Sequence, residues 1–176
     1  DHDASCPHCK GATGHTNIVF GTGNPDASLM FIGEAPGMEE DLQGVPFVGA
    51  AGKKLDQIIE AMGLYRTDVY IANTLKSRPP DNRTPTPDEV AACGPYLKSQ
   101  IEIISPSVIV TLGSPASKYI LETTNGITRL RGKWGAYKGI PVMPTYHPAY
   151  LLRNYTTEIR SQVWSDMKQV VEKLSL

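Results

Sequence analysis

Four polar side chains that could do chemistry each stand at or just after the end of a short apolar segment. They are Glu34, Asn73, Ser114 and His147. The apolar segments have the length and composition of buried strands, and in an open α/β sheet the carboxyl ends of the strands border the ligand crevice. We therefore expect a carboxylate, an amide, a hydroxyl and an imidazole to meet at one edge of a sheet.

Two residue types in this set suit a flat polar ring. The side-chain amide of Asn73 offers both a donor and an acceptor, which suits the edge of a nucleobase. Phe47, between Pro46 and Gly49, could provide a stacking platform. Each residue also has a simpler structural interpretation: Asn73 could be a turn residue, and Phe47 could be a core aromatic. Glu34, in its glycine-rich turn, could likewise be a solvated acid.

A proline-rich loop carries a local group of cations. Lys76, Arg78 and Arg83 surround residues 79–82 and could contact phosphates, or could simply be solvated. Both interpretations of these cations, phosphate contact and solvation, stay open at this point.

A second segment has the features of a DNA wedge. Residues 149–153 read as an exposed loop with two leucines beside Arg153. An apolar side chain that fills a gap in the base stack, next to a cation for the backbone, is what such a wedge needs. The competing interpretation is a helix start that packs Leu151 into the core.

Length and composition narrow the class of protein. The chain has 176 residues, the size of one domain, with 40% apolar and 20% charged residues and a net charge of -1. Since this is not the basic balance of many DNA-binding proteins, a nucleic-acid site must depend on local clustering. No signal peptide and no apolar stretch as long as a membrane span is visible, so we expect a cytoplasmic protein. Three cysteines do not suit a disulfide framework, and Cys6 and Cys9 form a CxxC that favours a metal or redox pair.

Apolar periodicity predicts alternating strands and helices. Strands are expected over 28–33, 69–73, 108–113 and 139–145, and helices over 53–62, 87–104 and 157–174, with a further helix after 114. Thr86, Pro87 and Glu89 form a capping box that marks the start of the second helix. The pattern predicts one domain over 1–176, an α/β/α sandwich around a mostly parallel central sheet.

Read together, five separated motifs resemble family 4 uracil-DNA glycosylases, the iron–sulfur branch found in bacteria and archaea. The motifs are Gly33-Glu34-Ala35-Pro36-Gly37 with Glu40-Asp41, Pro46-Phe47-Val48-Gly49, Asn73 with Arg78-Pro79-Pro80 and Asn82-Arg83, Cys93, and His147 through Arg153. The resemblance covers nearly the whole chain, and the motifs occur in the family's order. It implies an enzyme that flips uracil out of DNA, hydrolyses its N-glycosidic bond and so initiates base excision repair.

The resemblance assigns the uracil pocket. Phe47 is expected to stack on uracil, Asn73 to read its N3 and O4 edge, and His147 to donate a hydrogen bond to O2. The best-known uracil glycosylases have an aspartate where this chain has Ala35. We therefore expect Ala35 to lie in the pocket and Glu34 to support the water or the sugar cation.

The resemblance also assigns contacts around the pocket. Glu40 is expected to contact uracil and to exclude the C5 methyl group of thymine. The residues expected to contact DNA are Asn82, Arg83, Ser114, Leu151 and Arg153. The implied partner is uracil-containing DNA, single- or double-stranded, bound by a monomer in the nucleoid of a prokaryotic cell.

Family 4 enzymes hold a [4Fe–4S] cluster through four cysteines, and this chain departs from that pattern at one of them. The residues at the four positions are Cys6, Cys9, Ser77 and Cys93, so segment 1–16 and region 77–93 are expected to form the cluster subsite. Three outcomes stay open: Ser77 ligates a [4Fe–4S] cluster, the fourth iron takes water or is lost to leave [3Fe–4S], or the site binds zinc with help from His8.

Three other classes of protein compete with this interpretation. A related uracil-DNA cross-linking protein has a glutamine in the turn where this chain has Ala35, and a nucleophilic histidine in an inserted loop where residues 76–80 have none. A non-catalytic iron–sulfur DNA-binding module would not need Glu34, Asn73 and His147 at one edge. An unrelated α/β hydrolase would need a Gly-x-Ser-x-Gly motif, which the sequence lacks.

Overall fold

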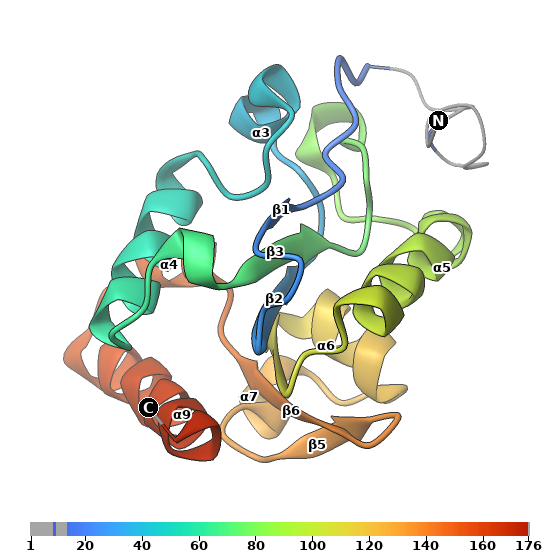
Figure 1. Ribbon diagram of the computed structural model, residues 1–176. Coiled ribbons are helices and arrows are strands. Elements are labelled where there is room, and N and C mark those ends of the chain that lie inside the picture. The colour runs from blue at the N-terminus through green and yellow to red at the C-terminus, as the bar shows by residue number, and fades with distance from the viewer. Residues whose placement is uncertain (1–8, 10–13, 176) are drawn as a thin grey trace.

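Six strands form one sheet in the computed structural model, which describes Cys9 and residues 14–175 (Figure 1). The strands are β1 Thr22–Gly23, β2 Leu29–Gly33, β3 Tyr70–Asn73, β4 Val108–Leu112, β5 Gly135–Tyr137 and β6 Ile140–Thr145. Their order is β1-β3-β2-β4-β6-β5. The four inner strands are parallel, and β1 and β5 pair antiparallel at the two edges. The predicted mostly parallel sheet is confirmed.

Helices cover both faces of the sheet. They are α3 Met38–Gln43, α4 Ala50–Ala61, α5 Pro87–Ile104, α6 Ser114–Leu121, α7 Ile127–Leu130, α8 Pro148–Arg153 and α9 Thr157–Leu174, with short 3-10 turns η1 Arg66–Asp68 and η2 Pro80–Asn82. In Figure 1, α4 and α9 lie on one side of the sheet and α5 and α6 on the other. In the described part of the chain, no helix is both long and apolar enough to cross a membrane.

The inner strands are largely apolar because both of their faces are covered. In β2, Leu29 and Phe31 belong to the core beneath α4 and α9, whereas Met30 and Ile32 belong to the core beneath α5 and α6. All four side chains are at most 2% exposed. The sheet is therefore a rigid support for the polar residues that follow its strands.

The capping signals read from the sequence are confirmed at α5. The Thr86 hydroxyl accepts from the Glu89 amide at 3.2 Å, and the Glu89 carboxylate accepts from the Thr86 amide at 2.9 Å. The terminal helix α9 also has its predicted bounds.

The expected loop at 149–153 is wrong, because these residues form α8. His147 caps the helix, since its Nδ1 accepts from the Ala149 amide at 3.0 Å, and Pro148 takes the first helical position. Leu151 is 3% exposed and belongs to the core shared with α4 and α9. The prediction of an exposed Leu151 is therefore wrong, and the competing interpretation of a helix start is right.

Candidate active site

A cavity of about 630 Å³ lies at the carboxyl edge of the parallel strands. Among the residues that line it are eight predicted site residues: Glu34, Ala35, Glu40, Asn82, Arg83, Ser114, His147 and Arg153. They come from the segments after β2, β4 and β6 and from the loop around η2. The structure thus brings together side chains that lie more than 100 positions apart in the chain, as the strand-end argument predicted.

Phe47 and Asn73 meet beside Gly33, next to the cavity residue Glu34. A Cβ atom built on Gly33 would lie 2.5 Å from both Asn73 Oδ1 and Phe47 Cζ. The missing side chain at position 33 therefore lets the amide and the ring approach each other. Phe47 is 5% exposed and Asn73 is 1% exposed, so this part of the site is its buried end.

The Asn73 amide has an unfilled hydrogen-bonding position. Its Oδ1 is buried and has no hydrogen-bond partner within the described part of the chain. Leaving such an acceptor unsatisfied costs about 1–3 kcal/mol. The end of β3 is nevertheless well fixed, because the Thr74 amide donates to the Gly33 carbonyl at 3.0 Å and the Leu75 amide donates to the Glu34 carbonyl at 3.0 Å. The structure therefore holds a costly free acceptor in a fixed position, as a ligand-binding group requires.

The Phe47 backbone is strained and is held by two charged side chains. Its φ is 54°, in the left-handed region that a bulky residue rarely adopts. The Arg66 guanidinium donates to the carbonyl oxygens of Pro46 and Phe47. Glu40 Oε2 accepts from the amides of Val48 at 2.9 Å and Gly49 at 2.7 Å. The position of the ring is therefore set before any ligand binds.

Glu40 lines the cavity, but its carboxylate is occupied by backbone groups. In addition to the two amides on Oε2, its Oε1 accepts from the Gly37 amide at 3.1 Å at the start of α3. The side chain thus joins the turn after β2 to the loop that carries Phe47. This arrangement supports a positioning role, and the expected contact of Glu40 with uracil stays a prediction.

Replacing this carboxylate tests the positioning role. In Glu40→Gln one carboxylate oxygen is replaced by the amide NH2 group, which cannot accept a hydrogen bond. At least one of the three hydrogen bonds from backbone amides is therefore lost. Because hydrogen bonds to charged groups contribute about 1.5–3 kcal/mol, we expect the melting temperature to fall by several degrees and the rate of base release to fall by about tenfold. Calorimetry and a release assay check both values. The control is Glu39→Gln, on the exposed side of the same helix; equal behaviour of the two variants would contradict the positioning role.

His147 is a neutral donor at physiological pH. Burial, and secondly the positive charge of Arg153, lowers the pKa of His147 from 6.5 to about 4, although Glu40 acts in the opposite direction. Its Nδ1 accepts from the Ala149 amide, so the single ring proton must be on Nε2. The imidazole lies with its centroid 5.5 Å from that of Phe47. His147 can therefore donate from Nε2 to a ligand held beside Phe47.

Glu34 supplies a carboxylate at the same edge. It is partly buried, and burial raises its pKa. Ala35, the next residue, is also partly buried and lines the cavity without a polar side chain. Glu34 is thus the acid next to Gly33, and its raised proton affinity suits a group that accepts a proton from water.

The basic loop divides into two parts. Arg83 and Asn82 are exposed and line the cavity, where Arg83 forms an ion pair with Glu89 and Asn82 accepts from Arg78 Nε at 2.6 Å. Lys76 does not contact solvent, so neither of its two interpretations, a phosphate contact or a solvated cation, is right. Its ammonium is fully buried and donates to the Asn73 carbonyl at 2.8 Å as well as to Phe20 and Gln100, and burial lowers its pKa to about 7.

The apolar residue beside Arg153 that reaches solvent is Leu152. It is 45% exposed, whereas Leu151 is buried. Ser114 lines the cavity at the start of α6, and its Oγ accepts from the Ile127 amide at 2.9 Å, which leaves its hydroxyl proton for another acceptor. The positions of Ser114 and Arg153 agree with the predicted DNA contacts, which stay predictions.

The residues expected to hold metal are partly described. Cys9 Sγ lies 3.3 Å from Ser77 Oγ and 3.8 Å from Cys93 Sγ, and all three side chains are buried. The Lys76 amide donates to Cys93 Sγ at 3.4 Å. Cys6 and His8 lie outside the described residues, within which no three His, Cys, Asp or Glu side chains form a metal-binding group. Two converging thiols with an adjacent hydroxyl fit a metal that prefers sulfur ligands.

Sequence reasoning missed the residues that position the site. Arg66 lies 19 positions after Phe47 and has no motif that marks it. Asp166 on α9 is fully buried, pairs with Arg131 and accepts from Thr145 Oγ1 at 2.7 Å at the end of β6. Tyr146 lines the cavity and stacks on Tyr150 with a centroid distance of 4.8 Å. Asp166 could have been found from the sequence, because it is a charged residue on the otherwise apolar face of the terminal helix.

Comparison with known proteins identifies the class and then the family. Residues 20–168 match the family model described as the Uracil DNA glycosylase superfamily. The chain is 48% identical over 168 residues to the type-4 uracil-DNA glycosylase of Thermotoga maritima, with 93% of this chain and 86% of the relative covered. It is 48% identical to that of Archaeoglobus fulgidus (96% and 87%) and 49% identical to that of Sulfurisphaera tokodaii (96% and 80%). The chain therefore belongs to the type-4 uracil-DNA glycosylases.

Proposed function

We propose that this protein releases uracil from DNA by hydrolysing the bond between uracil N1 and the deoxyribose C1′. The observation that carries the proposal is Asn73 Oδ1, which is buried without a partner in the described part of the chain and lies beside Phe47 and the neutral His147. Uracil N3–H donates to Asn73 Oδ1, and the Asn73 side-chain NH2 donates to uracil O4. Phe47 stacks on the base. Because this end of the site is buried, the nucleotide must leave the DNA stack to reach it.

The pocket acts on the charge that develops as the bond breaks. The bonding electrons pass to uracil, which leaves as an anion with negative charge on O2. His147 Nε2–H donates to O2, and this hydrogen bond strengthens as the charge grows. A preorganised donor of this kind accounts for roughly 10²–10³ in rate.

Water completes the reaction at the sugar. The C1′ centre becomes cationic, a water oxygen bonds to it, and the water proton passes to Glu34. The carboxylate also stabilises the sugar cation before water attacks, as carboxylates do in other glycoside hydrolyses. Ala35 leaves space beside the base without a competing acid.

DNA is held around the opening of the pocket. We assign the wedge to Leu152, because it is the exposed leucine next to Arg153. Arg153, Arg83 and Ser114 line the cavity and contact phosphates next to the flipped nucleotide. The protein acts as a monomer on single- or double-stranded DNA.

The direct test is incubation of the purified protein with oligonucleotides that carry one uracil, hypoxanthine or thymine. We expect free uracil and an alkali-labile abasic site from the first, and no release from thymine. On a denaturing gel, no protein–DNA adduct should remain. Absence of uracil release would leave a non-catalytic DNA-binding module, and a stable adduct would indicate a cross-linking protein.

We further propose that Cys6, Cys9 and Cys93 hold an iron–sulfur cluster with Ser77 at the fourth position. The supporting observation is the convergence of two thiols and a hydroxyl in a buried region. Because a neutral hydroxyl is a poorer iron ligand than a thiolate, the iron nearest Ser77 is held weakly. The cluster stabilises the fold and takes no part in hydrolysis.

Ser77→Cys tests this proposal through metal content. The wild-type protein should be brown and hold about three irons when handled in air, whereas the variant should hold about four and bleach more slowly. Iron and zinc analysis with electron paramagnetic resonance checks both. Ser99→Cys, on the exposed face of α5, is the control and should match the wild type. A colourless wild-type protein with one zinc would contradict the cluster.

A further inference from the structure

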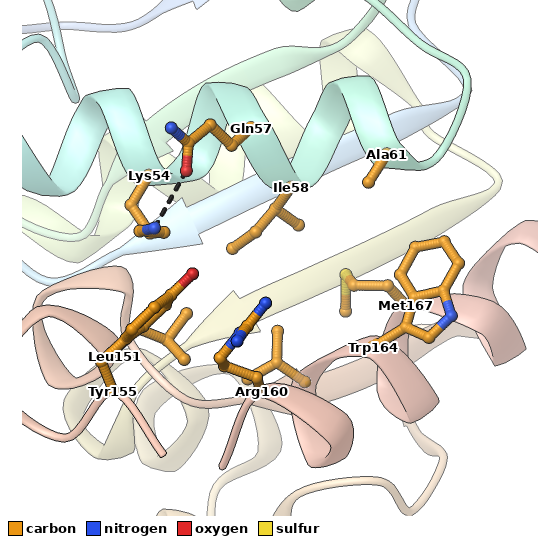
Figure 2. Close-up of a pocket in the computed structure, with 10 residues that line it drawn as sticks. Lys54, Gln57, Ile58, Ala61, Leu151, Tyr155, Arg160, Trp164 and Met167 are labelled. Carbon is orange, nitrogen blue, oxygen red and sulfur yellow. Dashed lines mark hydrogen bonds between the residues drawn. The ribbon is translucent and has the colours of Figure 1, made fainter. Parts of the chain in front are cut away.

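A groove of about 210 Å³ runs between α4 and α9 beside the end of α8 (Figure 2). Its floor is apolar and includes Ile58, Val163 and Met167. One end of the groove carries two cationic side chains, Lys54 from α4 and Arg160 from α9. None of these residues belongs to the uracil pocket.

Tyr155 holds the two cations in place. Lys54 Nζ lies 4.6 Å from the centre of the Tyr155 ring, and the Arg160 guanidinium carbon lies 4.6 Å from the same point. In Figure 2 the two cationic side chains lie on either side of the tyrosine. Their charges are therefore no more than twice this distance apart. Tyr155 is 57% exposed, so the group stands at the surface.

The two charges are available to a ligand. Neither Lys54 nor Arg160 forms a salt bridge with any of the residues that the structure describes. Among the described residues, the hydrogen-bond acceptor of Lys54 Nζ is the neutral Gln57 side chain, at 2.9 Å. In contrast, the cavity cation Arg83 is paired with Glu89. Lys54 is half-buried and Arg160 is exposed. Two fixed cations that form no ion pair within the described part of the chain favour a ligand with repeated negative charge.

The group lies close along the chain to residues that line the uracil pocket. Arg153 lines that cavity and lies two residues before Tyr155. Ala51 also lines the cavity and lies one helical turn before Lys54 on α4. Two separate elements thus lead from residues of the pocket to the cationic group, which places the group where a strand passing Arg153 could be bound.

We propose that Lys54, Tyr155 and Arg160 form a second DNA-backbone site, which binds phosphates of the strand beyond those next to the flipped uracil. The inference rests on the proposed DNA-binding face around Arg153. The site recognises charge and not sequence, because both faces of the Tyr155 ring are taken by cations. The ring is therefore not free to stack on a base. The two contacts extend the length of DNA that the protein binds.

The test is Lys54→Gln with Arg160→Gln in the full protein. On a 30-mer with a central uracil we expect KM to rise by about tenfold, and the slope of log affinity against log salt to fall by about 0.9 per lost phosphate contact on duplex DNA. On an oligonucleotide of only a few nucleotides, KM should equal that of the wild type, because the distant phosphates are missing. Thermal melting checks the fold.

The matched control is Lys98→Gln with Lys138→Gln. These two cations also lie over tyrosine rings, at 5.1 Å and 5.6 Å, and they line a different pocket together with the start of β6, at the opposite edge of the sheet. The control removes the same charge and should leave KM and the salt slope on the 30-mer unchanged. Equal KM values and salt slopes for the two double variants would overturn the proposal. Failure of the uracil-release function would instead appear as no release by the wild type on either substrate.

Discussion

Asn73→Ala should reduce the rate of uracil release by roughly 10²–10⁴, because it removes both the acceptor for N3–H and the donor to O4. The same change should leave the melting temperature unchanged or slightly higher. In the free protein Asn73 Oδ1 is buried with no hydrogen-bond partner among the residues that the structure describes, so its removal relieves an unfavourable burial. Single-turnover release and calorimetry measure the two effects.

The control for this variant is Asn24→Ala. Asn24 accepts from the Asp26 amide in a turn before β2, at the opposite edge of the sheet from the pocket. It should leave uracil release at the wild-type rate. If Asn73→Ala were to unfold the protein while sparing the rate of its folded fraction, Asn73 would be a structural residue and the pocket assignment would fail.

His147→Asn should reduce the release rate by about 10²–10³, since the shorter asparagine side chain does not place a donor where His147 Nε2–H donates to O2. Asparagine is a good helix cap, so this variant keeps an acceptor for the Ala149 amide at the start of α8. His147→Ala should lose the same activity and, in addition, about 1 kcal/mol of stability from the missing cap. Activity and stability are thus separated by two variants at one position.

The pH dependence of stability provides a second measurement on His147. Its pKa is about 4 in the folded protein and 6.5 as a reference for the unfolded chain. Between these values the unfolded chain binds more protons, so the free energy of unfolding falls as pH decreases from about 6.5 to about 4. Denaturant titrations across this range should show a smaller slope for His147→Asn. Identical slopes, or an imidazole that is charged at pH 6, would contradict the neutral donor.

Much of the fold could be predicted because local signals and the global pattern agree. Apolar runs marked the inner strands, and the Thr86–Glu89 capping box marked the start of α5. The strand-end rule placed Glu34, Ser114 and His147 at one cavity before any geometry was known. This rule holds because parallel strands align their carboxyl ends, whatever their separation in the chain.

Other features depend on contacts that a linear pattern does not contain. Residues 149–153 were expected to be a loop, because two leucines and an arginine suggest an exposed tip. His147-Pro148 is the local signal for a helix start here, because His147 caps the helix and Pro148 takes the first helical position. The hydrogen bonds of Arg66 and Glu40 to the loop around Phe47 could not be predicted from residue spacing. They form because a side chain from η1 and one from α3 converge on this loop in three dimensions.

The most direct test of the pocket is the nuclear magnetic resonance spectrum of the protein with ¹⁵N-labelled histidine and asparagine, recorded at neutral pH with and without free uracil. We expect a neutral His147 with its proton on Nε2. We also expect the His147 Nε2–H signal and the Asn73 side-chain amide signals to move together as uracil is added, while those of Asn24 do not. A proton on Nδ1, a charged imidazole, or uracil binding that leaves the Asn73 signals in place would contradict the pocket assignment.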